Sequence, residues 1–212
     1  MTTERLRIYC SGPLFNDPER AEMAQIAAAL EAAGFDTFLP HRDGLEFRAL
    51  LADLMMAGLA LEDAQAAWDR AIFALDTYQA VSGCDAVVVN LNGRVPDEGA
   101  VAEAAMAFAR GRTVVGYKND VRSLVMGRDN AMVAGLVGFR VVADPDAVAS
   151  ALREALTGPV GLNAVTAHGD TGSRRVDTTG IDSIIDLGRR IWADMSPVED
   201  LAKVARTVID AI

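Results

Sequence analysis

The chain has 212 residues, of which 51% are hydrophobic, and it carries a formal net charge of −10. This length and composition exclude a disordered chain and allow one domain with a sizeable core plus an appendage. Lysine and arginine are not clustered, which argues against nucleic acid as a partner. The longest apolar runs are too short to span a membrane and the first residues do not resemble a signal peptide, so we expect a cytoplasmic protein.

Metal-binding and disulfide patterns are also missing from the sequence. Cys10 and Cys84 fall at strand-like positions and are expected to be buried thiols, because two cysteines do not make a disulfide framework. His41 and His168 lie far apart, and no cluster has the spacing of metal ligands. We therefore expect no metal and no other cofactor.

Strand-like and helix-like segments alternate along most of the chain. In order they are a strand at 6–10, a helix at 19–33, a strand at 36–39, a long helical stretch at 46–81 with a break near Gly58, a strand at 86–91, a helix at 99–110, strands at 113–117 and 138–142, and a helix at 145–156. This alternation predicts an α/β fold of the Rossmann or flavodoxin-like kind, with a parallel five-stranded sheet and helices on both faces.

The end of the chain has a different character. Residues 158–180 are rich in Gly, Thr, Ser and Asp and are typical of a loop or linker. Two short amphipathic helices are expected after them, the second at 197–212, for packing or for contact between subunits. We therefore predict a catalytic domain at 1–157 and a linker with a C-terminal helical extension at 158–212.

The topology predicts where a ligand would bind. Parallel sheets bind ligands beyond the carboxyl ends of their strands, which here means the loops after residues 10, 39, 91 and 117. The loop after 91 leads into a helix that is expected to carry Glu103 in its first turn or so, where the helix dipole favours the ionised carboxylate that a nucleophile needs. Asp97 and Glu98 precede it and could share acid–base work in cleaving a sugar–heteroatom bond, or simply cap the helix.

Several segments in this order resemble the nucleoside 2-deoxyribosyltransferases. The segment 90–103 resembles the family signature, in which an aspartate loop precedes a helix-borne glutamate, and 39–47 resembles the loop of the branch with a Pro-x-Arg-Asp-Gly motif. Residues 8–15, 72–76, 116–123 and 129–132 are similar to further family segments, so that the resemblance spans about 6–142.

The resemblance implies a role for each matching residue. Glu103 would be the nucleophile on the anomeric carbon, Tyr9 would hold that glutamate by a hydrogen bond, and Asp97 would manage the proton of the leaving base. Asn130 would reach the sugar 5'-hydroxyl from a neighbouring subunit, which implies a homo-oligomer. The remaining positions expected to bind substrate are Gly12, Arg42, Asp43, Asp76, Asn92 and Met132.

The implied activity is transfer of 2-deoxyribose between nucleobases with retention, through a glutamyl–sugar intermediate, so that 2'-deoxynucleosides and free bases would be the small-molecule partners. The chain departs from the branch at Asn92, where an aspartate is frequent, at Ala104-Ala105, where Leu-Gly is usual, and at His41, where a glutamine is expected. Two alternatives remain: a hydrolase of 2'-deoxynucleosides or their 5'-monophosphates in the same superfamily, and a non-catalytic nucleotide-sensing module. The first loop, 11–16, is largely apolar with one serine, which favours an unphosphorylated substrate, and it lacks the Gly-x-Gly-x-x-Gly of dinucleotide sites.

Overall fold

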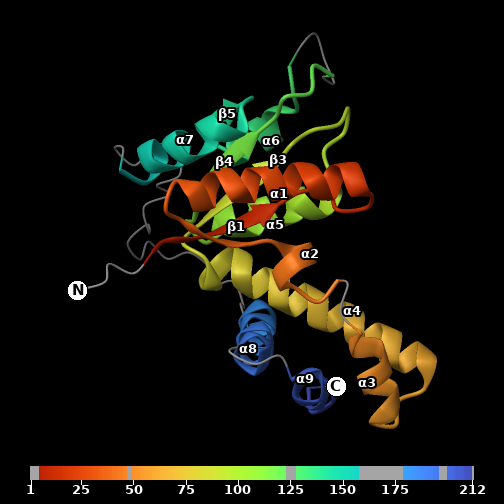
Figure 1. The fold of residues 1–212 in the computed structure, drawn as a ribbon. Helices are drawn as coiled ribbons and strands as arrows, with labels where there is room; N and C mark the ends of the chain where they lie inside the picture. The colour runs from red at the N-terminus through yellow and green to blue at the C-terminus, as the bar shows by residue number, and fades with distance from the viewer. Residues whose placement is uncertain (1–4, 47–48, 123–127, 158–178, 196–199, 212) are drawn as a thin grey trace. The chain divides into compact units, whose positions relative to one another are not determined.

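The computed structural model describes residues 5–46, 49–122, 128–157, 179–195 and 200–211 (Figure 1). Its elements in chain order are β1 (Arg7–Ser11), α1 (Asp17–Ala32), β2 (Asp36–Phe38), α2 (Pro40–Asp43), α3 (Leu50–Met56), α4 (Leu61–Tyr78), the π-helix η1 (Gln79–Gly83), β3 (Ala86–Asn90), α5 (Glu98–Ala109), β4 (Thr113–Tyr117), α6 (Ala131–Leu136), β5 (Val141–Val142), α7 (Pro145–Thr157), α8 (Thr179–Met195) and α9 (Leu201–Ile209).

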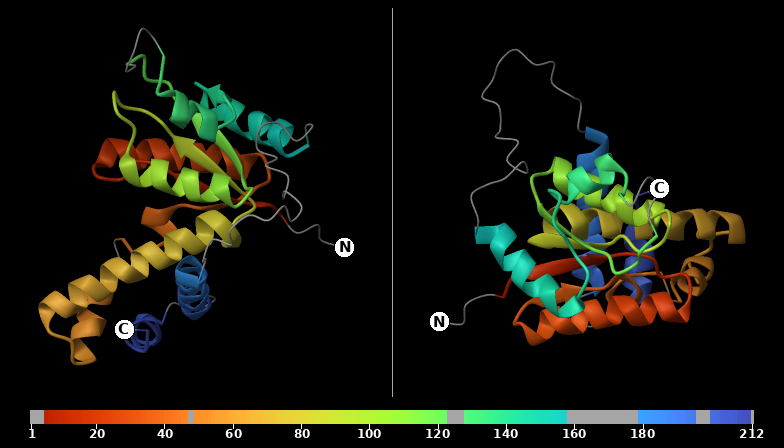
Figure 2. Two further views of the ribbon diagram at one scale, coloured as in Figure 1. Left: turned by 180° about the vertical axis from the view of Figure 1, so that it is seen from behind. Right: turned by 90° about the horizontal axis from the view of Figure 1, so that it is seen from above.

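The five strands form one parallel sheet in the order β2-β1-β3-β4-β5. Helices α1 and α7 cover one face of this sheet, and α5 covers the other (Figures 1 and 2). The predicted α/β class with helices on both faces is confirmed. Every residue of the central strand β3 is buried, which explains its nearly continuous apolar sequence.

The face of the sheet under α1 and α7 holds the hydrophobic core. Alternate strand residues point to opposite faces, so Ile8 and Cys10 join this core while Tyr9 and Ser11 point toward α5. Helix α1 begins after the cap of Asn16, whose side chain accepts the backbone N–H of Glu19 at 3.0 Å. It ends at Ala32, and Gly34 then turns the chain with a φ of +92°, which suits a glycine.

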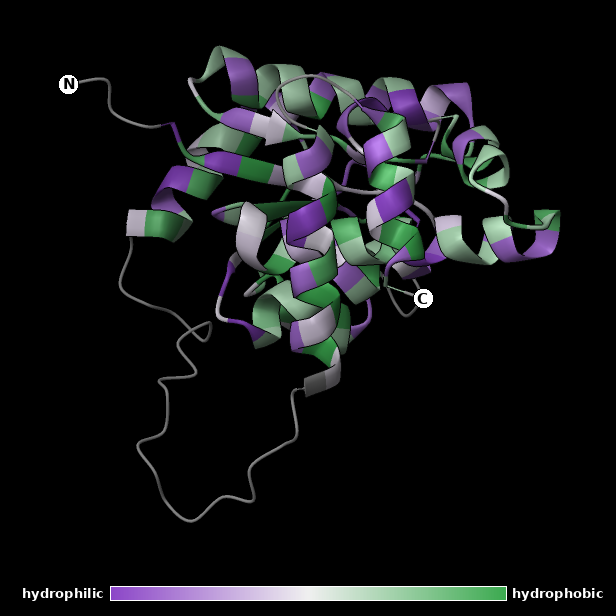
Figure 3. Ribbon diagram, turned by 90° about the horizontal axis from the view of Figure 1, so that it is seen from below, coloured by the Kyte–Doolittle hydropathy of each residue, from purple (hydrophilic) through white to green (hydrophobic). Residues whose placement is uncertain are grey.

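The chain divides into two compact units. The first contains the sheet and comprises Met1–Leu39 with Cys84–Ser173, and the second comprises Pro40–Gly83 with Arg174–Ile212. In the second unit α8 packs along α4 and contacts α9. Figure 3 shows that helices of the protein carry both hydrophilic and hydrophobic residues. Gly188 makes this packing possible, since a Cβ there would overlap the carbonyl oxygen of Ala74.

These contacts group the two C-terminal helices with residues from the middle of the chain. The contacts therefore divide the chain differently from the expected boundary at residue 157. The expected domain at 1–157 with an extension at 158–212 stays a prediction. The predicted linker at 158–180 lies almost wholly outside the described residues. The second of the two expected helices is present as α9, although 196–199 and 212 also lie outside them.

Local differences from the expected elements have local causes. The long helical stretch does break at Gly58, whose φ is +105°, between α3 and α4. The loop expected after Pro40 contains the single turn α2, and β5 is shorter than expected because Gly138 and Phe139 both have positive φ and turn the chain.

Among the described residues no helix has the length and apolar character needed to cross a membrane. Within the same residues, no three or more His, Cys, Asp or Glu side chains are grouped as metal ligands would be.

Candidate active site

Glu103 on α5 is held by two hydroxyl groups from β1. The Tyr9 hydroxyl donates to Glu103 Oε1 at 2.9 Å, and the Ser11 hydroxyl donates to Glu103 Oε2 at 2.5 Å. Each carboxylate oxygen therefore has its own donor, which orients the group and favours its ionised form. An oriented, ionised carboxylate is suited to act as a nucleophile.

The two donors are themselves fixed in the protein. Tyr9 and Ser11 are both fully buried, and the Tyr9 ring stacks on Phe38 with 5.6 Å between the ring centres. Ser11 was not among the residues selected from the sequence. Strand periodicity could have found it, because Ser11 follows Tyr9 by two residues and so lies on the same face of the sheet.

The helix start contributes less to Glu103 than expected. Helix α5 begins at Glu98, so Glu103 lies in its second turn rather than in the first. The effect of the helix dipole falls off within the first turn. The hydroxyls of Tyr9 and Ser11 hydrogen-bond the carboxylate directly, whereas the start of the helix is more than one turn away along the chain.

Asp97 is the N-cap of α5. Its Oδ2 accepts the backbone N–H of Ala100 at 2.7 Å, which satisfies one of the free donors at the helix start. The capping role considered from the sequence is thus observed. The role of Asp97 in managing the proton of a leaving base stays a prediction.

Asn92 joins three segments at the carboxyl edge of the sheet. Its Nδ2 donates to Glu22 Oε1 and to Asn119 Oδ1, each at 2.8 Å. Its Oδ1 accepts the backbone N–H groups of Asn119 at 2.9 Å and Asp120 at 3.0 Å. These groups of Asn92 face protein partners, and the expected substrate contact at this residue stays a prediction.

Gly12 lies at the same edge, in the loop after β1. A Cβ at this position would come within 2.5 Å of Met23 Sδ and 2.8 Å of Asn90 Cβ. The glycine therefore allows the first loop to pack closely against α1 and the end of β3.

Asn130 and Met132 begin the short helix α6. Asn130 caps it, accepting the backbone N–H of Met132 at 2.8 Å, and the Met132 side chain is 78% exposed. The preceding residue, Asp129, forms an ion pair with the largely buried ammonium group of Lys118 at the end of β4. This pair fixes the start of the segment that carries Asn130.

The remaining expected substrate residues belong to the second unit. Arg42 and Asp43 form an ion pair, with 2.8 Å between Arg42 Nη2 and Asp43 Oδ2. Asp76 lies on α4 and is 9% exposed. The structure thus brings Tyr9 together with Glu103, and it places Arg42, Asp43 and Asp76 in the other compact unit.

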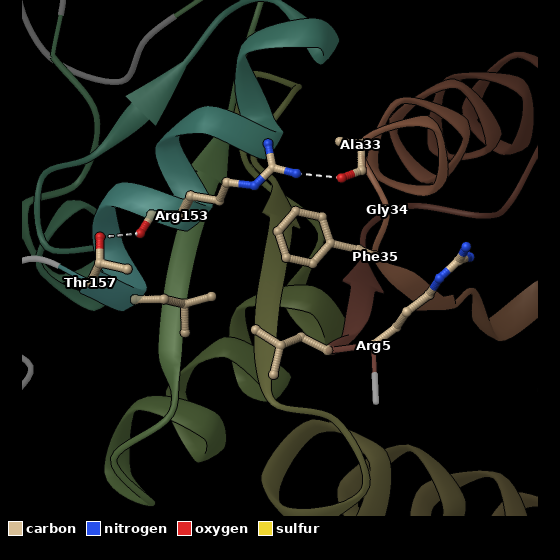
Figure 4. A pocket seen from close by; sticks show the side chains of 8 residues that line it. Arg5, Ala33, Gly34, Phe35, Arg153 and Thr157 are labelled. Carbon is tan, nitrogen blue, oxygen red and sulfur yellow. Dashed lines mark hydrogen bonds between the residues drawn. The ribbon is translucent and has the colours of Figure 1, made fainter. Parts of the chain in front are cut away.

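A pocket of about 290 Å³ lies at the opposite end of the sheet. Its lining residues precede β1 and β2 or end α7, and Arg153 spans it, stacking on the Phe35 ring and donating to the Ala33 carbonyl (Figure 4). Because ligands of parallel sheets bind beyond the carboxyl ends of the strands, this pocket is not the candidate active site.

Comparison with protein families supplies the deciding observation. The family model of nucleoside 2-deoxyribosyltransferases matches residues 8–164, more than half of the chain. The chain belongs to the nucleoside 2-deoxyribosyltransferase family. The resemblance found in the sequence is thereby confirmed, and with it membership of a family of enzymes that act on nucleosides.

Two solved structures are similar to the chain, and the first of them supports the fold. A conserved protein from Enterococcus faecalis V583 matches with a TM-score of 0.52 and 20% identity, covering 71% of this chain and 99% of that one. At this identity the match speaks for the fold alone. A 2-desoxiribosyltransferase from Leishmania mexicana matches with a TM-score of 0.33 and 16% identity over 85% of this chain and 97% of that one. No curated protein sequence matches the chain.

Proposed function

We propose that this member of the family is a nucleoside 2-deoxyribosyltransferase in which Glu103 is the nucleophile. The observation that carries the proposal is the pair of hydrogen bonds from Tyr9 and Ser11, which presents Glu103 as an oriented carboxylate. No other described feature of the chain combines a held carboxylate with the family's sequence context.

The proposed reaction has two displacements. One Glu103 oxygen attacks the anomeric carbon, the bond from that carbon to the base nitrogen breaks, and the electron pair goes to the base, which is protonated with help from Asp97. The nitrogen of a second base then attacks the same carbon, and Glu103 leaves as a carboxylate. Two inversions retain the β configuration, as in retaining glycosidases, and ping-pong kinetics follow.

The substrates are 2'-deoxynucleosides and free nucleobases. A 2'-hydroxyl withdraws electrons from the anomeric carbon and needs room beside the nucleophile, so a ribonucleoside should react more slowly. A 5'-phosphate is disfavoured because the first loop, 11–16, is largely apolar and has one serine. This supports transfer on a nucleoside over hydrolysis of a 5'-monophosphate.

Trapping the intermediate tests the proposal. A 2'-fluoro-2'-deoxynucleoside slows the second displacement, and mass spectrometry of peptides should then find the sugar on Glu103. Glu103→Gln keeps the shape of the side chain, and its amide can accept from one hydroxyl through Oε1 and donate to the other through Nε2. This variant should fold normally and exchange no bases. A sugar on another residue, or parent-rate exchange by a folded Glu103→Gln variant, would overturn the proposal. Product analysis separates exchange from release of free sugar.

A further inference from the structure

Glu22 is a carboxylate on α1 that the proposed reaction does not use. It accepts hydrogen bonds from Asn90 Nδ2 at 2.9 Å and from Asn92 Nδ2 at 2.8 Å, and more distantly from the Tyr117 hydroxyl at 3.4 Å. All three donors stand at or just beyond the carboxyl ends of β3 and β4. Their convergence on one carboxylate ties the helix to this edge of the sheet.

Asn92 connects Glu22 to the two loops that follow β3 and β4. Its Oδ1 accepts two backbone N–H groups of the loop after β4, those of Asn119 and Asp120. Asp120 in turn accepts the backbone N–H of Gly93 at 3.0 Å. The loop that leads from β3 to Asp97 is therefore attached both to α1 and to the neighbouring loop.

The partners of Asn92 require it to be a donor and an acceptor at once. Its Nδ2 faces two oxygen atoms, Glu22 Oε1 and Asn119 Oδ1, at 2.8 Å each. An aspartate here would bring a second carboxylate against that of Glu22 and would take the amide donor away from both acceptors, which is repulsive. The Asn92 side chain is thus matched to the negative charge of Glu22.

We propose that Glu22 is a positioning residue which, through Asn90 and Asn92, holds the loop that carries Asp97, and that Glu22 is what makes asparagine the required residue at position 92. The functional consequence rests on the proposed transfer reaction. Glu103 has its own anchors in Tyr9 and Ser11 on β1, so loosening the loop should impair proton transfer to the leaving base more than attack by the nucleophile.

Charge matching makes a reciprocal experiment possible. Asn92→Asp introduces the unfavourable carboxylate pair. Combining it with Glu22→Gln restores complementarity, because the glutamine oxygen can accept from Asn90 while its amide donates to the new aspartate. Gln25→Glu, on an exposed residue of the same helix, adds the same charge without a partner and serves as the matched control.

Two substrates separate loop positioning from a general loss of structure. A 2'-deoxynucleoside releases a base that must be protonated, whereas a 4-nitrophenyl 2-deoxyriboside releases a group that leaves as an anion. For Asn92→Asp we expect kcat/KM to fall about tenfold or more on the nucleoside and only slightly on the nitrophenyl substrate, since acid–base help contributes on the order of 10²–10⁴-fold. Glu22→Gln with Asn92→Asp should return most of the nucleoside activity, and Gln25→Glu should match the parent.

Equal losses on both substrates, or a double variant no more active than Asn92→Asp, would overturn the positioning role. Should Asn92→Asp fail to fold, the double variant alone decides, by recovering nucleoside activity or not. Thermal unfolding of the parent, Glu22→Gln, Asn92→Asp and the double variant gives a second test that needs no activity: additive changes in Tm would overturn the pairing of Glu22 with Asn92. A parent protein inactive on both substrates would instead refute the proposed function. The comparison of Tm values would then test the pairing of Glu22 with Asn92 by itself.

Discussion

At the scale of single residues, the two hydroxyls on Glu103 have separable consequences. Tyr9→Phe and Ser11→Ala each remove one hydrogen bond to a charged group, roughly 1.5–3 kcal/mol. If all of this lost interaction energy is lost from the transition state, kcat/KM drops about tenfold to a hundredfold in each variant. Each hydroxyl also favours the ionised carboxylate, so the acid limb of the pH–rate profile should move to higher pH.

Steady-state rates across pH, with circular dichroism to check the fold, measure this. Phe38→Leu, which alters the stacking partner of Tyr9 but no donor to Glu103, is a useful comparison. A Ser11→Ala variant with the parent rate and an unmoved acid limb would show that only Tyr9 matters.

Tyr117 links the same region to stability at high pH. Burial and the nearby Glu22 carboxylate raise the pKa of Tyr117 from 10.0 to about 12. Below pH 10 the phenol is protonated in both folded and unfolded chains. Between pH 10 and 12 only the unfolded chain releases the proton, so the free energy of unfolding falls as pH rises.

The variant Tyr117→Phe removes that proton and should lose less stability over this range. The measurement is the free energy of unfolding in urea at pH 8, 10 and 11, for the variant and the parent. The difference between the two proteins should shift in favour of the variant above pH 10. A difference that is constant with pH would contradict the assignment.

At the scale of elements, Asp97 serves α5 as a cap and, in the proposed reaction, the base as a proton handler. Asp97→Ala loses both roles, and cap removal costs about 0.5–2 kcal/mol. Asp97→Asn keeps an oxygen for the Ala100 N–H but cannot exchange a proton. We expect both variants to lose base exchange and only Asp97→Ala to lose stability.

Chemical denaturation and exchange rates, measured side by side, distinguish the two roles. An Asp97→Asn variant that exchanges bases at the parent rate would reduce Asp97 to a helix cap. The helix would then still present Glu103 correctly, because its position depends on β1 as well as on the helix start.

At the scale of the whole molecule, we expect an oligomer whose sites combine two subunits. Several apolar side chains are exposed on the loops beyond the carboxyl ends of the strands and on α6: Phe15 at 80%, Val95 at 62%, Val121 at 96% and Met132 at 78%. Such side chains suit an interface. Asn130, beside Met132, is the residue that the family resemblance assigns to a neighbour's site.

Complementation between inactive variants tests this arrangement. Glu103→Ala and Asn130→Ala subunits, each inactive alone, should recover about a quarter of the parent activity when unfolded, mixed equally and refolded as a dimer, because half of the dimers are mixed and each has one intact site. No recovery from the mixture, with light scattering showing a dimer, would place Asn130 in its own subunit's site. A fully active monomer would refute the assembly.

Much of the architecture follows from the sequence because it depends on local patterns. The apolar run of β3, the helical spacing in α1 and the break at Gly58 each reflect neighbours along the chain, and together they predict the parallel sheet and its carboxyl edge. The spacing of Asp97 and Glu103 on a strand–loop–helix segment likewise predicts the candidate nucleophile, supported by the family's order of motifs.

Contacts between distant residues were decided only by the tertiary structure. Ser11 reaches Glu103 across 92 positions, and Glu22 reaches Asn92 across 70, distances over which no periodicity carries information. The grouping of α8 with α4 is of the same kind, since an amphipathic helix shows that it must bury one face but does not specify against what. The sequence by itself thus determined the helices and strands and the helix that carries Glu103, because these depend on local propensity. Tertiary packing decided which groups orient the Glu103 carboxylate and which helices the C-terminal helices contact.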